Sequence, residues 1–247
     1  MKHGNIYIGT SGWHYKHWTG SFYPAGTKPS DQFSLYKEHF NAVEINNSFY
    51  RLPSLNVFKK WHAESPEKFL FVVKANRFIT HNKKLKDPEE SIKRFFDNVK
   101  FLRKKLGPIL FQLPPSWKKN VVRIESFLEA LPKRYRYVFE FRNSTWYDED
   151  IIQALRRHRS AFCIYELAGH LSPVFITADF VYVRLHGPGA GKYQGSYTDK
   201  QLAEWSKQCE EWKREGLDVF IFFDNDEKGY AAFNAKAFQK IVSKHKP

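Results

Sequence analysis

The sequence predicts a (β/α)8 barrel of the TIM type, an α/β fold whose eight strands are parallel. Its length of 247 residues is close to that of a typical single barrel. Eight short apolar runs alternate with segments whose apolar residues repeat at helical spacing, as βαβ units require. Several runs end in polar residues that strand alternation separates from their large apolar neighbours. No linker interrupts the pattern, so we expect one domain over residues 1–247.

The first half of the chain is expected to contain four strands and three helices. The strands are predicted from short apolar runs near residues 5–10, 42–47, 70–75 and 108–113. The helices are predicted at 30–39, 55–64 and 89–106. The last of these is the clearest: Asp87 is its expected N-cap, Pro88 lies in its first turn, and Gly107-Pro108 ends it.

The second half repeats the alternation, with one irregular link. Strands are expected near residues 137–142, 161–166, 180–186 and 218–224. Helices are expected at 121–131, 148–158, 199–215 and 230–244, and Thr198 and Gln201 form a capping box before the third of these. The link between the sixth and seventh strands, residues 167–179, contains Gly169 and Pro173 and is too short for a good helix.

Polar residues at the ends of the strands form the candidate site. The carboxyl ends of parallel barrel strands meet at one mouth, where enzymes of this fold place their active sites. Charges turned inward are costly unless they line a polar cavity, which favours a functional site over a plug. The residues expected there are Glu44, Asn46, Lys74, Asn76, Gln112, Glu140, Arg142, Arg184, His186, Asp224 and Asn225, with Glu166 and Trp13 beside them.

Mixed charges allow several kinds of chemistry. Glu44 and Glu140 could act as general acid and base, as in glycoside hydrolysis. Lys74 could form a Schiff base or stabilise developing charge, or it could simply pair with a glutamate. Arg142, Arg184 and His186 suit a phosphate or a carboxylate.

A divalent metal is the remaining alternative for the same positions. Glu44, Glu140, His186 and Asp224 are residue types that ligate such ions. Lysine and arginine are interleaved with them, which counts against a metal. The sequence identifies no cofactor.

A glycine-rich loop and several aromatic residues complete the expected mouth. Residues 187–195, after His186, could cradle a phosphate or cover the substrate, but they do not match a Walker loop. Base or sugar rings stack on aromatic side chains. The aromatic candidates for substrate binding are Trp13, Tyr50, Trp146 and Tyr193.

Charge and hydropathy limit the classes of partner that the protein is expected to bind. The formal net charge of +14 favours an anionic small molecule or nucleic acid, although a solvated basic surface would give the same count. No run is long enough to span a bilayer and no signal peptide begins the chain, so a cytoplasmic protein without membrane contact is expected. Cys163 and Cys209 form no metal or redox motif and are expected to be packing residues. The oligomeric state stays open.

The motifs resemble those of the YecE-like family, catalogued as domain of unknown function number 72. The segments that carry the resemblance are Gly9–Trp13, Val43–Pro53, Val73–His81, Leu110–Pro115, Phe139–Arg142, Tyr182–Gly187 and Phe222–Asp226. The resemblance covers nearly the whole chain and implies a TIM-barrel fold. The activity of the family is not established, so the resemblance implies a fold and a site without a reaction.

Taken together, these patterns predict an enzyme that acts on an anionic, phosphate-bearing substrate, with nucleic acid among the candidates. The leading reaction is phosphoester hydrolysis. Arg142 and Arg184 would clamp the phosphate, His186 or Glu140 would transfer protons, and Lys74 would stabilise charge. One alternative is a carbohydrate-active enzyme that uses Glu44 with Glu140. Another is a nucleic-acid-binding module without catalytic activity.

Overall fold

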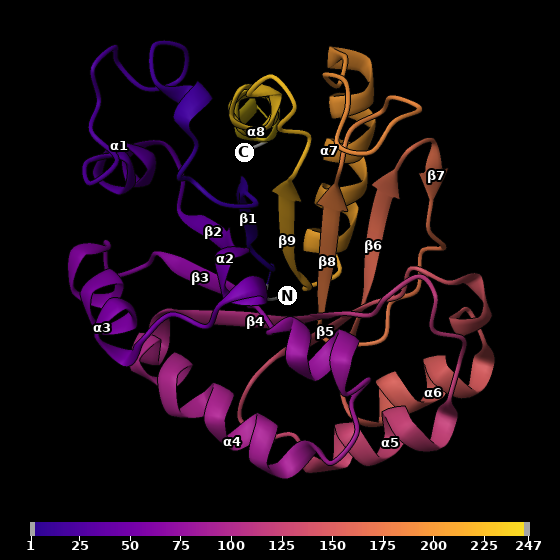
Figure 1. Ribbon diagram of the computed structural model, residues 1–247. Coiled ribbons are helices and arrows are strands. Elements are labelled where there is room, and N and C mark those ends of the chain that lie inside the picture. The colour runs from indigo at the N-terminus through magenta and orange to yellow at the C-terminus, as the bar shows by residue number, and fades with distance from the viewer. Residues whose placement is uncertain (1–2, 245–247) are drawn as a thin grey trace. The chain divides into compact units, whose positions relative to one another are not determined.

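A computed structural model describes residues 3–244 of the chain (Figure 1). Contacts divide it into two compact units. Unit 1 comprises the described parts of residues 1–44, 164–172 and 180–247, and unit 2 comprises residues 45–163 and 173–179. The organisation of the chain as one domain stays a prediction.

Eight strands follow one another with parallel pairing. Their order is β1-β9-β8-β6-β5-β4-β3-β2, and Ser11, just after β1, forms a parallel bridge with Glu44 of β2. This order confirms the predicted fold class, the TIM-type parallel α/β barrel. The strand bounds are β1 Ile6–Thr10, β2 Ala42–Ile45, β3 Leu70–Lys74, β4 Leu106–Gln112, β5 Tyr137–Glu140, β6 Ala161–Leu167, β8 Phe180–Leu185 and β9 Asp218–Phe223.

Helices join the strands at nearly all the expected places. The helices with predicted counterparts are α1 Gln32–His39, α3 Leu55–Glu64, α4 Pro88–Val99, α5 Val121–Ala130, α6 Glu149–Arg157, α7 Asp199–Arg214 and α8 Tyr230–Lys244. A short helix that the sequence pattern did not predict, α2 (Asn47–Tyr50), follows β2. The predicted capping box is present, because Thr198 and Gln201 each accept from the other's backbone N–H at the start of α7.

Each unit has a buried core beneath its helices. In unit 1, α7 and α8 contact each other and both pack against β9 (Figure 1). In unit 2, α4 contacts α3 on one side and α5 on the other, and α5 contacts α6. All six residues of β8 are buried, including its polar members Tyr182 and Arg184. A polar side chain can stand on such a strand only if its hydrogen bonds are satisfied internally.

The helix predicted over residues 89–106 begins where expected, but it is not one α-helix to its end. Asp87 occupies the N-cap position, but its backbone is left-handed (φ 43°) and its side chain makes no capping bond. The α-helix stops at Val99, a 3-10 segment (η3, Lys100–Lys105) follows, and Gly107-Pro108 lies inside β4. The β3–β4 register shifts between Phe71 and Val73. Such a bulge tolerates a proline, which has no N–H for the ladder.

The irregular link between the sixth and seventh expected strands contains a small hairpin. A two-residue strand, β7 (His170–Leu171), pairs antiparallel with the end of β6. Ala168 and Gly169 form the turn, with φ values of 52° and 76°. Two consecutive positive φ values are typical of a tight hairpin turn. The link is therefore irregular as predicted, and it adds a short antiparallel strand beside the end of β6.

Candidate functional site

Arg184 is the centre of a buried polar cluster in unit 1. Its Nη2 and Nε donate to the two carboxylate oxygens of Glu44 at 2.6 and 2.9 Å. Both side chains are almost wholly removed from solvent, with exposures of 1% and 0%. Ser11 Oγ and Tyr182 Oη also donate to Glu44, each at 2.6 Å. The carboxylate thus accepts four hydrogen bonds, which is how a buried charge is kept satisfied. We call Ser11, Glu44, Tyr182, Arg184, His186 and Asp224 the Arg184 cluster.

Asp224 and His186 complete the Arg184 cluster. Asp224 follows β9, and its Oδ2 lies 3.0 Å from Arg184 Nη2 and 3.0 Å from His186 Nδ1. His186 Nε2 lies 3.2 Å from Arg184 Nη1. A guanidinium can only donate, so Nε2 accepts and the ring proton is assigned to Nδ1, facing Asp224. With a neutral imidazole, two carboxylates face one guanidinium, and the cluster is formally anionic. Asp224 is its most accessible acid, with 13% of the side chain exposed.

A second aspartate near Asp224 has a different environment. Trp18 Nε1 donates to Asp226 Oδ1 at 2.8 Å, and His17 Nε2 lies 2.8 Å from Oδ2. Burial, helped by repulsion from Asp224, raises the pKa of Asp226 to about 6, although Trp18 and His17 act in the opposite direction. Asp226 is therefore a carboxyl group that gives up its proton near pH 6, well above the usual range for an aspartate.

Tyr15 stands in the field of the same carboxylates. Its hydroxyl donates to the backbone carbonyl of Ser11. Burial raises its pKa well above the usual range, and the charges of Asp224, Asp226 and Glu44 raise it further. Tyr15 is therefore a neutral hydrogen-bond donor beside the acids and cannot act as a phenolate base.

The glycine-rich loop covers His186. The Tyr193 ring meets the His186 ring edge-on, with 5.4 Å between their centroids. Gly187 N donates to Tyr197 Oη at 3.0 Å and Gly189 N donates to Gln194 O at 3.1 Å, so these two amides are occupied inside the loop. This arrangement favours a cover over a phosphate cradle.

Unit 2 holds a second buried ion pair. Arg142 Nε donates to Glu140 Oε1, and the two side chains are 10% and 0% exposed. Cys163 Sγ lies 3.9 Å from the other oxygen of Glu140. On the neighbouring strand, Gln112 is in register with Glu140 and donates to Leu113 O at 3.0 Å. The Arg142 guanidinium is thus bound by a carboxylate.

The remaining polar candidates of unit 2 lie around α2. Lys74 Nζ is 4.5 Å from the centre of the Phe49 ring, a cation–π contact. Asn76 donates to Ser48 O at 3.1 Å and accepts from a backbone N–H two residues on. Asn46 is half-buried at the start of α2.

The remaining candidates, three aromatic residues and Asn225, differ from one another in burial. Trp13 and Trp146 are buried, the first against Phe33 and the second stacked on Phe141 with its Nε1 donating to Trp117 O. Tyr50 is 73% exposed. Asn225 is fully buried and donates to Gly195 O and Asn234 Oδ1, which ties the loop to α8.

The Arg184 cluster belongs to unit 1 and the Glu140–Arg142 pair to unit 2, and their meeting at one mouth stays a prediction. Within residues 3–244, no three His, Cys, Asp or Glu side chains are arranged as metal ligands. In unit 1, Arg184 Nη2 contacts both Glu44 and Asp224, so a positive charge already lies between these two carboxylates. In the same part of the chain, no helix has both the length and the apolar content that crossing a membrane requires.

Sequence reasoning did not select several residues of the unit 1 site. Ser11 and Tyr182 bind Glu44, and His17 contacts Asp226. Alternation placed Tyr182 on the same face as Arg184, and Asp226 belongs to a recognisable motif, Phe222–Asp226. Those signals were present, but none of them indicates that Asp226 is buried.

Comparison with known proteins places the chain in a family. A family model described as protein of unknown function DUF72 matches residues 7–247. The UPF0759 protein YunF of Bacillus subtilis (strain 168) is 30% identical over 269 residues, which cover 96% of this chain and 94% of YunF. The UPF0759 protein YecE of Escherichia coli (strain K12) is 27% identical over 143 residues, which cover 58% of this chain and 50% of YecE.

Solved structures agree with this placement. A DUF72 family protein of Thermotoga maritima, TM1631, superposes with a TM-score of 0.87 at 31% identity, covering 97% of this chain and 99% of its own. A glycoside hydrolase family 5 enzyme of Prevotella bryantii shares the fold alone, at a TM-score of 0.54 and 9% identity over 96% of each chain. The predicted resemblance is thus confirmed: the chain belongs to the DUF72 family of proteins of unknown function.

Proposed function

We propose that the protein is a hydrolase that uses Asp224 and Asp226 as its base and acid. The observation that carries this proposal is the contrast between the two carboxyl groups. Asp224 is ion-paired with Arg184, whereas burial raises the pKa of Asp226 to about 6. A carboxylate can accept a proton, and a neighbouring carboxyl group that is still protonated can donate one. Arg184 and His186 act as positioning residues, because both hold Asp224.

Local charge favours a neutral substrate, a carbohydrate cleaved at its glycosidic bond. Two carboxylates, Glu44 and Asp224, contact the Arg184 guanidinium, and Asp226 lies close enough to Asp224 for the two acids to repel each other. Two like charges 4 Å apart near a protein surface repel by about 4 kcal/mol. The charges behind the net +14 are spread over the chain, and exposed charges are screened beyond about 8 Å. Repulsion at the site therefore outweighs the attraction of the distant lysines and arginines.

Phosphoester hydrolysis is the second candidate. It is favoured by the net charge of +14 and by Lys192, an exposed cation in the loop whose Tyr193 contacts His186. An exposed lysine in that loop could neutralise a phosphate beside the acids. In this candidate the substrate is an anionic small molecule or nucleic acid. A cytoplasmic location stays a prediction for both candidates.

Chromogenic substrates separate the candidates. Purified protein is assayed with a panel of 4-nitrophenyl glycosides and with bis(4-nitrophenyl) phosphate. We expect glycoside turnover, reduced about a hundredfold or more in Asp224→Asn and in Asp226→Asn, the usual scale for losing a general acid or base. Asp97→Asn, which removes an exposed aspartate of unit 2, should leave the rate unchanged.

The outcomes of this assay are distinct. Turnover of the phosphodiester alone would move phosphoester hydrolysis ahead of the carbohydrate reaction. Turnover of neither class by folded protein, or equal rates in Asp224→Asn and Asp97→Asn, would remove the acid–base proposal.

A further inference from the structure

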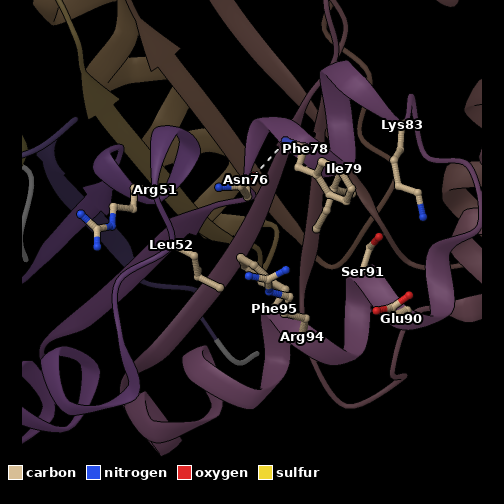
Figure 2. A pocket seen from close by; sticks show the side chains of 10 residues that line it. All are labelled: Arg51, Leu52, Asn76, Phe78, Ile79, Lys83, Glu90, Ser91, Arg94 and Phe95. Atoms are coloured by element: carbon tan, nitrogen blue, oxygen red, sulfur yellow. Dashed lines mark hydrogen bonds between the residues drawn. The ribbon is translucent and has the colours of Figure 1, made fainter.

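Unit 2 contains a cavity that shares Asn76 with the candidates described above but includes none of the residues of the hydrolase proposal. Its volume is about 460 Å³, within the usual range for small-molecule sites. The walls come from the segment after α2, from the π-helical turn η2 (Phe78–Asn82) with Lys83 after it, and from the first two turns of α4 (Figure 2). All of these elements belong to unit 2.

The polar side of the cavity is cationic. Arg51, Lys83 and Arg94 line it, against one carboxylate, Glu90. Among residues 3–244, no acidic side chain lies within ion-pair distance of the guanidinium of Arg51 or of Arg94. Lys83 Nζ donates to Asp87 O at 3.1 Å, which keeps its charge beside the cavity. Two guanidinium forks and an ammonium are the groups that proteins use to bind phosphate.

The other side of the cavity is apolar. Leu52, Ile79 and Phe95 line it, and the last two are only 4% and 2% exposed. Phe78 also lines the cavity, yet it is 51% exposed (Figure 2). A large half-exposed aromatic side chain at a cavity is placed to cover an apolar ligand. The lining therefore suits a molecule with a charged end and an apolar body.

The backbone of this wall is strained. η2 is a π-helical turn. This conformation is rare in proteins overall, and where it does occur it is often found at a functional site. Lys84, Leu85 and Asp87 follow with φ values of 47°, 62° and 43°. None is a glycine, so each conformation costs about 1 kcal/mol or more. The buried Leu85 side chain fixes the segment in place. A strained backbone conformation persists only where the packing around it leaves no relaxed alternative, so the shape of this segment is fixed.

We propose that this cavity binds a small organic phosphate monoester, with the phosphate on Arg94 and its apolar body against Ile79, Phe95 and Phe78. The dianionic group of a monoester matches the excess of cations better than a single carboxylate does. The site does not depend on Asp224 or Asp226, so it stands or falls separately from the hydrolase proposal.

Calorimetry on the full chain with phenyl phosphate tests the site, and inorganic phosphate and phenol report the two halves of the ligand. Phenyl phosphate should bind saturably and more tightly than either half. Arg94→Gln should weaken it about tenfold or more, the scale of a charged hydrogen bond. Lys93→Gln is the matched control, because it removes one charge from the next residue of the same helix, which does not line the cavity. Glu90→Gln should tighten binding.

A second variant tests the apolar half. Phe78→Ala should weaken phenyl phosphate while leaving inorganic phosphate unchanged. Arg94 and Phe78 are exposed, so melting temperatures close to wild type should show that both variants fold. The proposal is overturned if phenyl phosphate shows no saturable binding at millimolar concentration or binds no better than inorganic phosphate. It is also overturned if Lys93→Gln weakens binding as much as Arg94→Gln. The hydrolase proposal is tested separately: Asp224→Asn should bind phenyl phosphate as the wild-type protein does, whatever its hydrolase activity.

Discussion

Arg184 shows how a single buried charge organises its surroundings. The guanidinium is 1% exposed and contacts Glu44, Asp224, Ser11 and His186. Removing an ion from water costs several kcal/mol, and only well-placed partners offset this cost. Its role is therefore to hold two carboxylates in fixed positions, whereas the sequence alone predicted a direct contact with phosphate.

Glu44→Gln should destabilise the protein by about 3 kcal/mol, since it leaves the buried Arg184 with one carboxylate where it had two. The free energy of unfolding in urea measures this effect. Glu64→Gln is the control, because Glu64 pairs with Lys60 on the surface, where ion pairs contribute little. Similar losses in the two variants would show that Glu44 is not buried.

Glu140→Gln makes the matching change in unit 2. It should destabilise the protein by about 3–5 kcal/mol, because Arg142 loses the carboxylate that it contacts. The same urea titration measures the loss. A transition midpoint equal to that of the wild-type protein would mean that Glu140 is exposed and unpaired in solution.

Asp226 should make both stability and rate depend on pH. Burial raises its pKa from 3.8 to about 6 in the folded protein, so the folded state binds this proton more tightly than the unfolded chain does. The resulting stabilisation is complete below pH 3.8 and is lost as the pH rises through 6. Relative to Asp226→Asn, the wild-type protein should lose on the order of 2 kcal/mol between pH 4 and 7.

Unfolding in urea across this pH range, with both proteins, measures the difference. A difference that does not change with pH would mean an ordinary pKa for Asp226. In the hydrolase assay, kcat/KM should fall as the pH rises through about 6, because the acid loses its proton.

The loop of residues 187–195 is an element whose shape depends on glycine. Gly187 has φ 106°, and a Cβ atom there would lie 2.1 Å from the backbone oxygen of Gln194. The loop covers His186 through Tyr193 and is tied to α8 through Asn225. A change at Gly187 should therefore move the cover without touching the acids.

Gly187→Ala is expected to destabilise the loop and to alter hydrolase activity. Gly26→Ala is the matched control, because Gly26 also has a positive φ (78°) but a Cβ atom would meet nothing within 4 Å. The control should cost about 1 kcal/mol from backbone strain alone. Thermal melting and the chromogenic assay compare the two. Equal effects would show that the contact with Gln194 is absent in solution.

Over the whole molecule, the net charge of +14 should produce salt-dependent binding to nucleic acid. Fluorescence anisotropy of a labelled DNA duplex should show affinity that falls steeply between 50 and 200 mM salt, since counterions are released from the phosphates. Turnover of a neutral glycoside should change little over the same range. Binding that does not depend on salt would contradict a purely electrostatic contact. Salt-dependent binding without turnover of any substrate would favour the non-catalytic alternative.

The sequence determined the fold class and most of its elements, because periodicity is a local property. Strand and helix patterns gave eight parallel strands in the expected places, and the capping box of α7 lies where Thr198 and Gln201 predicted it. Local signals were incomplete at Gly107-Pro108: the helical segment ends just before it, as expected, but β4 begins already at Leu106 and includes both residues. A bulge in the pairing with β3 accommodates that proline, and pairing between strands is not encoded in either segment alone.

Only the tertiary structure decided how the polar residues are paired. Glu44 and Arg184 are 140 positions apart, and nothing in the sequence states that one carboxylate takes two guanidinium nitrogens. The raised pKa of Asp226 and the cationic cavity beside Arg51 and Arg94 likewise come from burial and from contacts between distant elements. A sequence fixes which side chains a strand presents, whereas desolvation and ion pairing depend on every element packed around them, and these decide the chemistry.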